Sequence, residues 1–287
     1  MPNSYVSRRS TEAQGFSAWT PPSGVLASLT DEAQRRAATL KPRAAELHRL
    51  AEGVTRISPF GTALRRSEVS VIAEIKRASP SKGSINPDLP VRDQVRAYER
   101  GGAAAISILT EPTRFIGSND DLVAAAGVTD LPLLKKDFHV DPLQIIEAKS
   151  IGASAALVIV RAVPPTRLRE LLEVGRSIGI EILVEIRDER ELDCALAFGA
   201  KVIGVNNRDL ETLTIDPEMA PRLLPLIPRD IVAIAESGMK TADDVKRVAA
   251  AGADSVLIGS ELSASVNPEA AVRSLSGVKR SEGARKD

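Results

Sequence analysis

The stretch VIAEIK, residues 71–76, has the composition of a buried β-strand and also carries two charged side chains. Side chains at positions i and i+2 of a strand point to the same face, so Glu74 and Lys76 share a face with Ile72. A buried charge is costly unless it is paired or used. The stretch therefore predicts a strand whose inner face leads into a site that needs charge.

Seven more short runs of β-branched or apolar residues follow this stretch at regular intervals. Helix-like segments separate them, and several of these segments end in the glycine that suits a helix C-terminus. Eight strand–helix units in about 200 residues predict a closed (β/α)8 TIM barrel, a fold of about 250 residues. The seven runs lie at residues 104–109, 131–138, 155–161, 180–186, 202–206, 231–236 and 255–259.

An open, doubly wound parallel sheet is the alternative fold. Such a sheet would carry a glycine-rich dinucleotide-binding turn after its first strand. The corresponding segment here, KRASPSKGS at residues 76–84, matches that pattern poorly. The barrel is therefore the preferred prediction.

The composition excludes several classes of function. The 287 residues contain 38 Lys plus Arg and 38 Asp plus Glu, so no net charge attracts the chain to nucleic acid or to a membrane. With one cysteine, Cys194, and two histidines, no disulfide framework and no metal site are predicted. No apolar run has the length of a signal peptide or a membrane span. These features predict a cytoplasmic protein without a nucleic-acid or membrane partner.

The two ends of the chain differ in composition from its body. Residues 1–24 are polar, with Ser, Pro and Gly, and residues 276–287 are charged, so both are predicted to be poorly ordered tails. Residues 25–275 are predicted to form a single barrel with an N-terminal helical extension at about residues 25–65. Helix is expected from Thr30 to Glu52, with Thr30 and Asp31 as capping residues and Pro42 as a break or second start.

Polar side chains recur late in the apolar runs. In TIM barrels the active site forms at the C-terminal ends of the strands, so these side chains are expected to meet at one mouth. In LLKKDF, residues 133–138, alternation places Lys136 on the inner face and Lys135 on the outer face. A single charge at a strand end is commonly a rim salt bridge, but a converging set favours an acid–base site. The set is Glu74, Lys76, Lys136, Glu185, Asn206, Arg208, Glu236, Ser237, Gly259 and Ser260.

The last two runs are followed by a second signal. AESGM, residues 235–239, and LIGSEL, residues 257–262, place Ser237, Gly238, Gly259 and Ser260 where barrels commonly hold a phosphate group. Glycines let backbone N–H groups approach the phosphate, and hydroxyls add donors. Ordinary turns use the same residue types, so the signal indicates a phosphorylated small molecule without naming it.

Seven motifs together resemble one enzyme family. EIKRASPSKG, FIGS, LLKKDF, LVEIRD, GVNNRDL, AESG and LIGS occur in the order and at about the separations found in indole-3-glycerol phosphate synthases, over roughly residues 60–265. The resemblance implies a barrel that converts 1-(2-carboxyphenylamino)-1-deoxyribulose 5-phosphate into indole-3-glycerol phosphate, releasing carbon dioxide and water without a cofactor. The N-terminal region resembles the family less, because the usual helix rich in Lys and Glu is replaced by one rich in Arg and Ala. His139 stands where an aliphatic residue is common and is expected to be peripheral.

The resemblance also implies roles for individual residues. Lys136 matches the general acid that protonates the ketone oxygen, and Glu185 is a candidate base. Glu74 and Lys76 would form a proton-handling or charge-balancing pair whose separate roles stay open. The implied binding residues are Arg208 for the benzoate carboxylate, with Asn206 and Ser79 as further donors; Phe115, Phe138 and Leu157 for the anthranilate ring; Glu236 to orient the lysines; and Ser237, Gly238, Gly259 and Ser260 for the phosphate, with Lys76 reaching toward it.

Three alternatives stay open. Another phosphate-binding barrel, such as a sugar-phosphate isomerase or the tryptophan synthase α-subunit, would share the fold but is not expected to have EIKRASPSKG together with LLKKDF. A barrel that binds an aromatic phosphate without turning it over would be free to lose Lys136 or Glu185, and this chain retains both. The N-terminal extension could also recruit a partner protein. The segment SPSKGSI is expected to close over the substrate, and no oligomeric state or protein partner is predicted.

Overall fold

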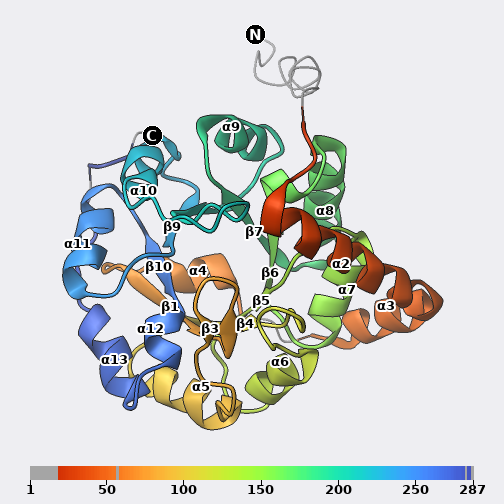
Figure 1. Ribbon diagram of the computed structural model, residues 1–287, viewed down its shortest axis with the longest axis horizontal. Helices are drawn as coiled ribbons and strands as arrows, with labels where there is room; N and C mark the ends of the chain where they lie inside the picture. Colours follow the sequence, from red (N-terminus) through yellow and green to blue (C-terminus); the bar gives the residue numbers. More distant parts are fainter. Residues whose placement is uncertain (1–18, 56–57, 282, 286–287) are drawn as a thin grey trace.

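The structure is a computed structural model that describes residues 19–55, 58–281 and 283–285. Within these residues, eight parallel strands form one closed barrel in the order β1-β10-β9-β8-β7-β6-β5-β4 (Figure 1). Each predicted apolar run overlaps one of these strands to within two residues at either end, so the predicted fold class is confirmed. The strands are β1 (Ser70–Ile75), β4 (Ala105–Leu109), β5 (Leu133–Lys136), β6 (Ala155–Ile159), β7 (Glu181–Ile186), β8 (Val202–Asn206), β9 (Val232–Glu236) and β10 (Ser255–Ile258).

The strand register brings polar residues to the C-terminal end of the barrel. Asn206 at the end of β8 lies beside Glu236 at the end of β9, and Lys136 is the last residue of β5. Lys135 points outward, where its Nζ lies 2.6 Å from Glu147 Oε2. The predicted inward orientation of Lys136 and outward orientation of Lys135 are both confirmed.

Helices surround the barrel on the outside (Figure 1). Side chains set the start of several of them: Asp141 and Gln144 form a capping box at one helix, and Thr241 and Asp244 form another. The helices that follow β1 in the chain are α5 (Val91–Arg100), α6 (Asn119–Ala126), α7 (Pro142–Ser150), α8 (Pro165–Ile178), α9 (Glu189–Ala197), α10 (Met219–Leu223), α11 (Ala242–Ala250), α12 (Ser260–Ser263) and α13 (Pro268–Leu275).

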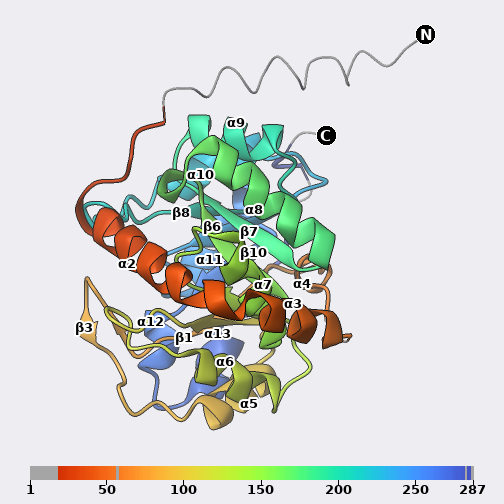
Figure 2. The same ribbon diagram turned by 90° about the vertical axis from the view of Figure 1, so that its right-hand side faces the viewer.

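The N-terminal extension begins with α2 (Gly24–Leu40) at the C-terminal mouth of the barrel, continues along the outside beside α7, and ends in a short helix that closes the opposite end (Figure 2). Its other elements are a 3-10 turn (Lys41–Arg43), α3 (Ala44–Gly53) and, at the opposite end, α4 (Phe60–Leu64). The break predicted at Pro42 is confirmed by the turn. The predicted start at Thr30 is wrong, because α2 begins at Gly24 and the Thr30 hydroxyl donates to the Leu26 carbonyl inside the helix. Residues 1–18 of the predicted tail lie outside the described residues.

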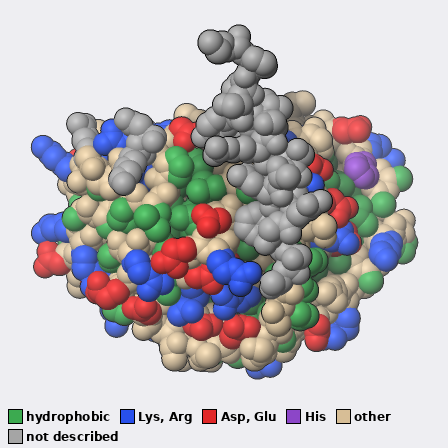
Figure 3. All heavy atoms as spheres, turned by 90° about the horizontal axis from the view of Figure 1, so that it is seen from above, with side chains coloured by type: hydrophobic (Ala, Val, Ile, Leu, Met, Phe, Trp, Pro, Cys, Tyr) green, Lys and Arg blue, Asp and Glu red, His purple; other side chains and the backbone are tan. Residues whose placement is uncertain are grey.

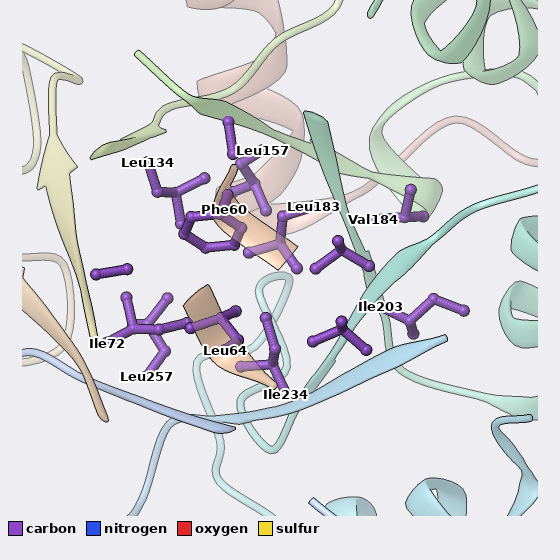
Figure 4. Close-up of a cluster of buried hydrophobic side chains, with 14 of the residues drawn as sticks. Phe60, Leu64, Ile72, Leu134, Leu157, Leu183, Val184, Ile203, Ile234 and Leu257 are labelled. Atoms are coloured by element: carbon purple, nitrogen blue, oxygen red, sulfur yellow. The ribbon is translucent and has the colours of Figure 1, made fainter. Parts of the chain in front are cut away.

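Apolar side chains fill the barrel interior at the end nearest α4 (Figure 4). Phe60 and Leu64 of α4 are fully buried and lie among Ile72, Leu183 and Ile234 from the barrel strands. Interiors packed in this way exclude water. Polar chemistry inside the barrel is therefore confined to the opposite end, where the strands finish.

The described residues of the C-terminal segment pack against the barrel. The Val69 N–H donates to the Val278 carbonyl at 2.8 Å. Arg280 and Arg285 both pair with the buried carboxylate of Asp254, and Arg285 Nη2 lies 2.7 Å from Asp254 Oδ2. These residues differ from the poorly ordered tail that the composition predicted, because their charges have a buried partner elsewhere in the chain.

The outer surface carries charges of both signs. Figure 3 shows Lys and Arg side chains interspersed with Asp and Glu side chains on one face of the molecule. This mixture agrees with the equal totals of basic and acidic residues in the sequence. Among the described helices, none combines the length and the apolar composition needed to cross a membrane.

Candidate active site

Five charged side chains meet at the C-terminal ends of four barrel strands. Lys136 Nζ of β5 lies 3.2 Å from Glu185 Oε2 of β7 and 3.3 Å from Glu236 Oε2 of β9. Lys76 Nζ, just after β1, lies 3.4 Å from Glu74 Oε1. The three carboxylates are almost fully buried, and both lysines are largely buried. The cluster is therefore a buried group of acids and bases, not a set of rim salt bridges.

Neutral side chains hold two of the carboxylates in place. Asn206 Nδ2 donates to Glu185 Oε1 at 2.9 Å, and Ser107 Oγ donates to Glu74 Oε2 at 3.3 Å. Asn206 Oδ1 in turn accepts the Arg208 N–H at 2.9 Å. The sequence reasoning missed Ser107, although a hydroxyl inside the apolar run AISIL was a signal that could have identified it.

Burial and neighbouring charges shift the pKa values in the cluster. Burial alone would lower the pKa of the Lys136 ammonium, but the carboxylates of Glu236 and Glu185 outweigh burial and raise it. Burial raises the pKa of Glu236 to about 8, against the opposing effect of Lys136. Burial lowers the pKa of Lys76, although the carboxylate of Glu74 opposes the change. Lys136 therefore holds its proton more tightly than an ordinary lysine, and Lys76 releases its proton more readily.

Apolar side chains form one wall of the cavity beside the charges. The ring centroids of Phe115 and Phe138 are 6.3 Å apart, and Leu157 of β6 lies in the same wall. Val25 and Leu29 of α2 complete it. The sequence reasoning missed these two residues, because their position depends on how α2 docks on the barrel. A slot of this kind suits a flat aromatic group.

The loops after β9 and β10 form another side of the cavity. Ser237 and Gly238 both have left-handed backbones, with φ of 64° and 86°, and Gly259 directly precedes α12. A Cβ atom on Gly259 would lie 2.2 Å from Glu74 Oε1, so the close approach requires glycine. Turns that point successive backbone N–H groups at one place are able to bind an anion.

A short hairpin stands at the rim of the same cavity. It consists of β2 (Ala78–Ser79) and β3 (Gly83–Ser84), which the sequence reasoning described only as a loop. Ser79 Oγ accepts the Lys82 N–H at 3.2 Å, and Lys82 Nζ lies 2.8 Å from Glu261 Oε1 of α12. The hairpin therefore connects the end of β1 to the loop after β10. Its closure over a substrate stays a prediction.

Most predicted site residues share this single cavity. Glu185 is the exception: it lies beside the lining, in contact with Lys136 and Asn206. Among the described residues, no group of His, Cys, Asp and Glu side chains is arranged to bind a metal ion. The predicted residues that line the cavity are Glu74, Lys76, Ser79, Phe115, Lys136, Phe138, Leu157, Asn206, Arg208, Glu236, Ser237, Gly238, Gly259 and Ser260.

His139 is buried next to this wall and is not among the residues that line the cavity, so its peripheral role stays a prediction. Its side chain is 2% exposed, and its Nδ1 lies 2.6 Å from the carbonyl oxygen of Leu157. Burial lowers the pKa of His139 to about 4. A neutral imidazole of this kind is able to donate one hydrogen bond and so hold the backbone of Leu157 in place.

Comparison with known proteins relates the chain to one family. The family model described as indole-3-glycerol phosphate synthase matches residues 26–275. The chain belongs to the indole-3-glycerol phosphate synthase family. The indole-3-glycerol phosphate synthase 2 of Streptomyces coelicolor is 44% identical over 259 residues, which cover 89% of this chain and 100% of the relative. The synthases of Dehalococcoides mccartyi and Mycobacterium ulcerans are 46% and 48% identical, each over 74% of this chain and over 83% and 78% of their own lengths.

Two solved structures share the fold of this indole-3-glycerol phosphate synthase family member at low identity. Thiamine phosphate pyrophosphorylase from Pyrococcus furiosus has a TM-score of 0.56 and 17% identity, over 74% of this chain and 95% of its own. The 3-hexulose-6-phosphate synthase from Salmonella typhimurium has a TM-score of 0.58 and 14% identity, over 72% of this chain and 96% of its own. Likeness at such identities shows the fold alone.

The match to the indole-3-glycerol phosphate synthase family reaches further than the seven motifs. The motifs span roughly residues 60–265, whereas the family model begins at residue 26, inside α2. The resemblance predicted from the motifs is confirmed. The helices α2 and α3 are also part of the family unit, despite their Arg- and Ala-rich composition.

Proposed function

We propose that this chain converts 1-(2-carboxyphenylamino)-1-deoxyribulose 5-phosphate into indole-3-glycerol phosphate, the reaction that its family's name indicates. One observation carries the proposal. In a chain of this family, the Lys136 ammonium lies between the carboxyl groups of Glu185 and Glu236, at a mouth that is also lined by apolar side chains and by the turns after β9 and β10. The substrate balances against the product, one carbon dioxide and one water, so the reaction consumes no oxidant, reductant or other co-substrate.

The two anionic ends of the substrate fit different sides of the cavity. The phosphate would bind at the turns after β9 and β10, through Ser237, Gly238, Gly259 and Ser260. The benzoate carboxylate would bind the guanidinium of Arg208, whose planar fork matches a carboxylate, with Asn206 and Ser79 as further donors. The aromatic ring between them would then lie against Phe115, Phe138 and Leu157.

Ring closure is the step that we assign to Lys136. The aromatic carbon that bears the carboxylate attacks the ketone carbon, and negative charge develops on the ketone oxygen. An ammonium at that oxygen stabilises the charge and donates a proton, which forms a hydroxyl group. The two carboxyl groups beside Lys136 support this role, because their contacts hold the side chain in one orientation and the charge of Glu185 favours its ammonium form before the substrate binds.

The later steps require one more acid and one base. Loss of carbon dioxide breaks the bond to the carboxylate carbon and restores the aromatic ring. Loss of water then removes the new hydroxyl group and a proton from the new five-membered ring. We assign this proton transfer jointly to Glu185, Glu74 and Lys76, which lie at the same mouth of the barrel.

The test is turnover of the carboxyphenylamino deoxyribulose phosphate, followed by the fluorescence of the indole product. The variant is Lys136→Ala, and the matched control is Lys201→Ala, which removes an exposed lysine just before β8 that pairs with Asp230. The wild type and the control are expected to form product, and Lys136→Ala is expected to lose at least about 100-fold in kcat. A wild type that binds the substrate without forming product would refute the proposal in favour of a binding protein.

A further inference from the structure

Arg161, in the 3-10 turn after β6 (Val160–Ala162), is the centre of an ion-pair network outside the charged cluster. Its Nη2 lies 2.8 Å from Asp188 Oδ2, its Nε lies 2.7 Å from Glu191 Oε1, and its Nη1 lies 3.3 Å from Glu211 Oε2. These carboxylates follow β7 and β8, so one guanidinium connects three consecutive loops at the mouth. Nothing in the proposed chemistry uses this network.

Glu211 connects the network to the start of α2. Its Oε1 accepts hydrogen bonds from the Ser23 N–H at 2.6 Å and from the Ser23 hydroxyl at 2.9 Å. Its backbone carbonyl accepts the Val25 N–H at 3.3 Å. Gly24 lies between, with φ of 58°, and a Cβ atom there would lie 2.3 Å from that carbonyl. The first turn of α2 is therefore seated on Glu211.

The same loop also holds Arg208 through its backbone. Leu213 has a left-handed backbone, with φ of 66°, and its carbonyl accepts Arg208 Nη1 at 2.9 Å. The Leu213 N–H donates to the Asp209 carbonyl at 2.7 Å, and Asp209 Oδ1 accepts the Glu211 N–H at 2.8 Å. A left-handed backbone is unfavourable for leucine, so the surrounding contacts must hold this turn. Glu211 supplies contacts on the side of the turn that faces Arg161 and α2.

We propose that Glu211, held by Arg161, is a positioning residue that fixes the Arg208 guanidinium for the substrate carboxylate. The inference rests on the proposed function, in which Arg208 binds that group. A bidentate hydrogen bond depends on the placement of the donor fork, so movement of the loop weakens it. Glu211 thereby makes the N-terminal segment, through Ser23, part of the machinery that recognises the carboxylate.

A second anchor keeps α2 on the barrel when the first is removed. Near its C-terminal end, Arg36 makes a bidentate pair with Asp137, at 2.7 and 2.9 Å, directly after β5. Loss of the Glu211 carboxylate is therefore expected to release the loop and the first turn of α2 without undocking the helix. The indole emission of Trp19, the single tryptophan in the sequence, checks this locally, because its Nε1 donates to the Arg161 carbonyl at 3.2 Å.

The experiment compares two reduced, unreactive analogues of the substrate by titration calorimetry. One is 1-(2-carboxyphenylamino)-1-deoxyribitol 5-phosphate, and the other lacks only the carboxylate. We expect Glu211→Ala to weaken binding of the first about tenfold and of the second less than about twofold. Glu211→Gln, which keeps an acceptor for Ser23, should recover part of the loss. The control Glu170→Ala, which removes an exposed pair with Arg167 on α8, should change neither.

The outcomes separate this inference from the proposed function. Equal weakening of both analogues by Glu211→Ala, with product still formed by the wild type, would refute the positioning role and leave the function intact. A wild type that forms no product would refute the function itself. If Glu211→Ala does not fold, the test uses Glu211→Gln and Arg161→Lys instead. Each of these variants is then expected to weaken binding of the carboxylated analogue more than binding of the other analogue, and equal weakening of both would refute the inference.

Discussion

The buried pair between Arg36 and Asp137 gives a sharp prediction about the N-terminal extension. Arg36→Met would leave the Asp137 carboxylate, which is 2% exposed, without its bidentate partner. Breaking one side of a buried pair typically costs about 3–5 kcal/mol. Asp137 would keep hydrogen bonds from the Thr110 hydroxyl at 2.7 Å and the Phe138 N–H at 2.8 Å. We therefore expect a loss of about 3 kcal/mol in the free energy of unfolding, at the lower end of that range.

The neighbouring Arg35 provides the matched control. It pairs with Glu32 on the exposed side of the same helix, with 68% of its side chain accessible, so Arg35→Met should change stability little. Stability would be measured by urea unfolding, followed by circular dichroism. The double variant Arg36→Met with Asp137→Asn should recover much of the loss, because it leaves no unpaired charge. Equal losses for Arg35→Met and Arg36→Met would refute this account of α2 docking.

The effect of Arg36 should also depend on pH. Burial would raise the pKa of Asp137, but the hydrogen bonds from Arg36, together with the charges of Lys135 and Arg36, outweigh burial and hold that pKa well below its usual range. A carboxyl whose pKa is lowered on folding stabilises the protein above its unfolded pKa of about 3.9. The difference between the wild type and Arg36→Met should be complete at pH 7 and shrink as the pH falls below about 4. A difference that stays constant down to pH 2 would contradict the assignment to this ion pair.

Three further predictions concern the site. Because burial lowers the pKa of His139 to about 4, the contribution of His139 to stability should fall by about 3 kcal/mol as the pH drops from about 6.5 to 4, and the wild type should lose more stability over this acid limb than His139→Gln in urea unfolding. Because burial raises the pKa of Glu236 to about 8, its contribution should fall as the pH rises from about 4.3 to 8, and Glu236→Gln should flatten that alkaline decline. In Gly259→Ala, the added Cβ should displace the Glu74 carboxylate and lower kcat/KM about 100-fold, measured by product fluorescence.

Each of these predictions has an outcome that contradicts it. An unchanged acid limb in His139→Gln would mean that the imidazole does not titrate as described. If the stability of Glu236→Gln falls with rising pH as steeply as that of the wild type, the titrating group is not Glu236. Normal kcat/KM in Gly259→Ala would show that the Glu74 carboxylate has room to move without loss of activity.

The barrel and its charged cluster could be predicted from the sequence because they depend on local periodicity. The apolar runs identify the strands, and the period of two places Lys136 inside and Lys135 outside. Strand order in a parallel barrel then brings the last residues of the runs together without further information. Ser107 follows the same logic and would have been found by examining polar residues in the middle of a run.

The remaining features depend on pairings between distant residues. Thr30 has the residue type of a helix cap, but α2 begins earlier, at Gly24. The residue before this start, Ser23, is held by Glu211, which lies 188 positions later in the sequence. The charges of Arg285 suggested a solvated tail, but Asp254 provides a buried partner for them. No spacing rule predicts which acid a given arginine will meet. These contacts become visible only in three dimensions.

The pairing of β1 with β10 also determines when the site can be completed during synthesis. Ser70 and Ser255, which pair across this junction, are 185 residues apart. At about 5–20 residues per second, a ribosome needs on the order of 10–40 seconds to make the intervening segment. Through that interval β1 has no β10 beside it, and Glu74 remains open to water on that side. The charged cluster can thus be desolvated only after β10 has been made, and a nascent chain stalled before β10 would expose the very charges that the finished enzyme buries.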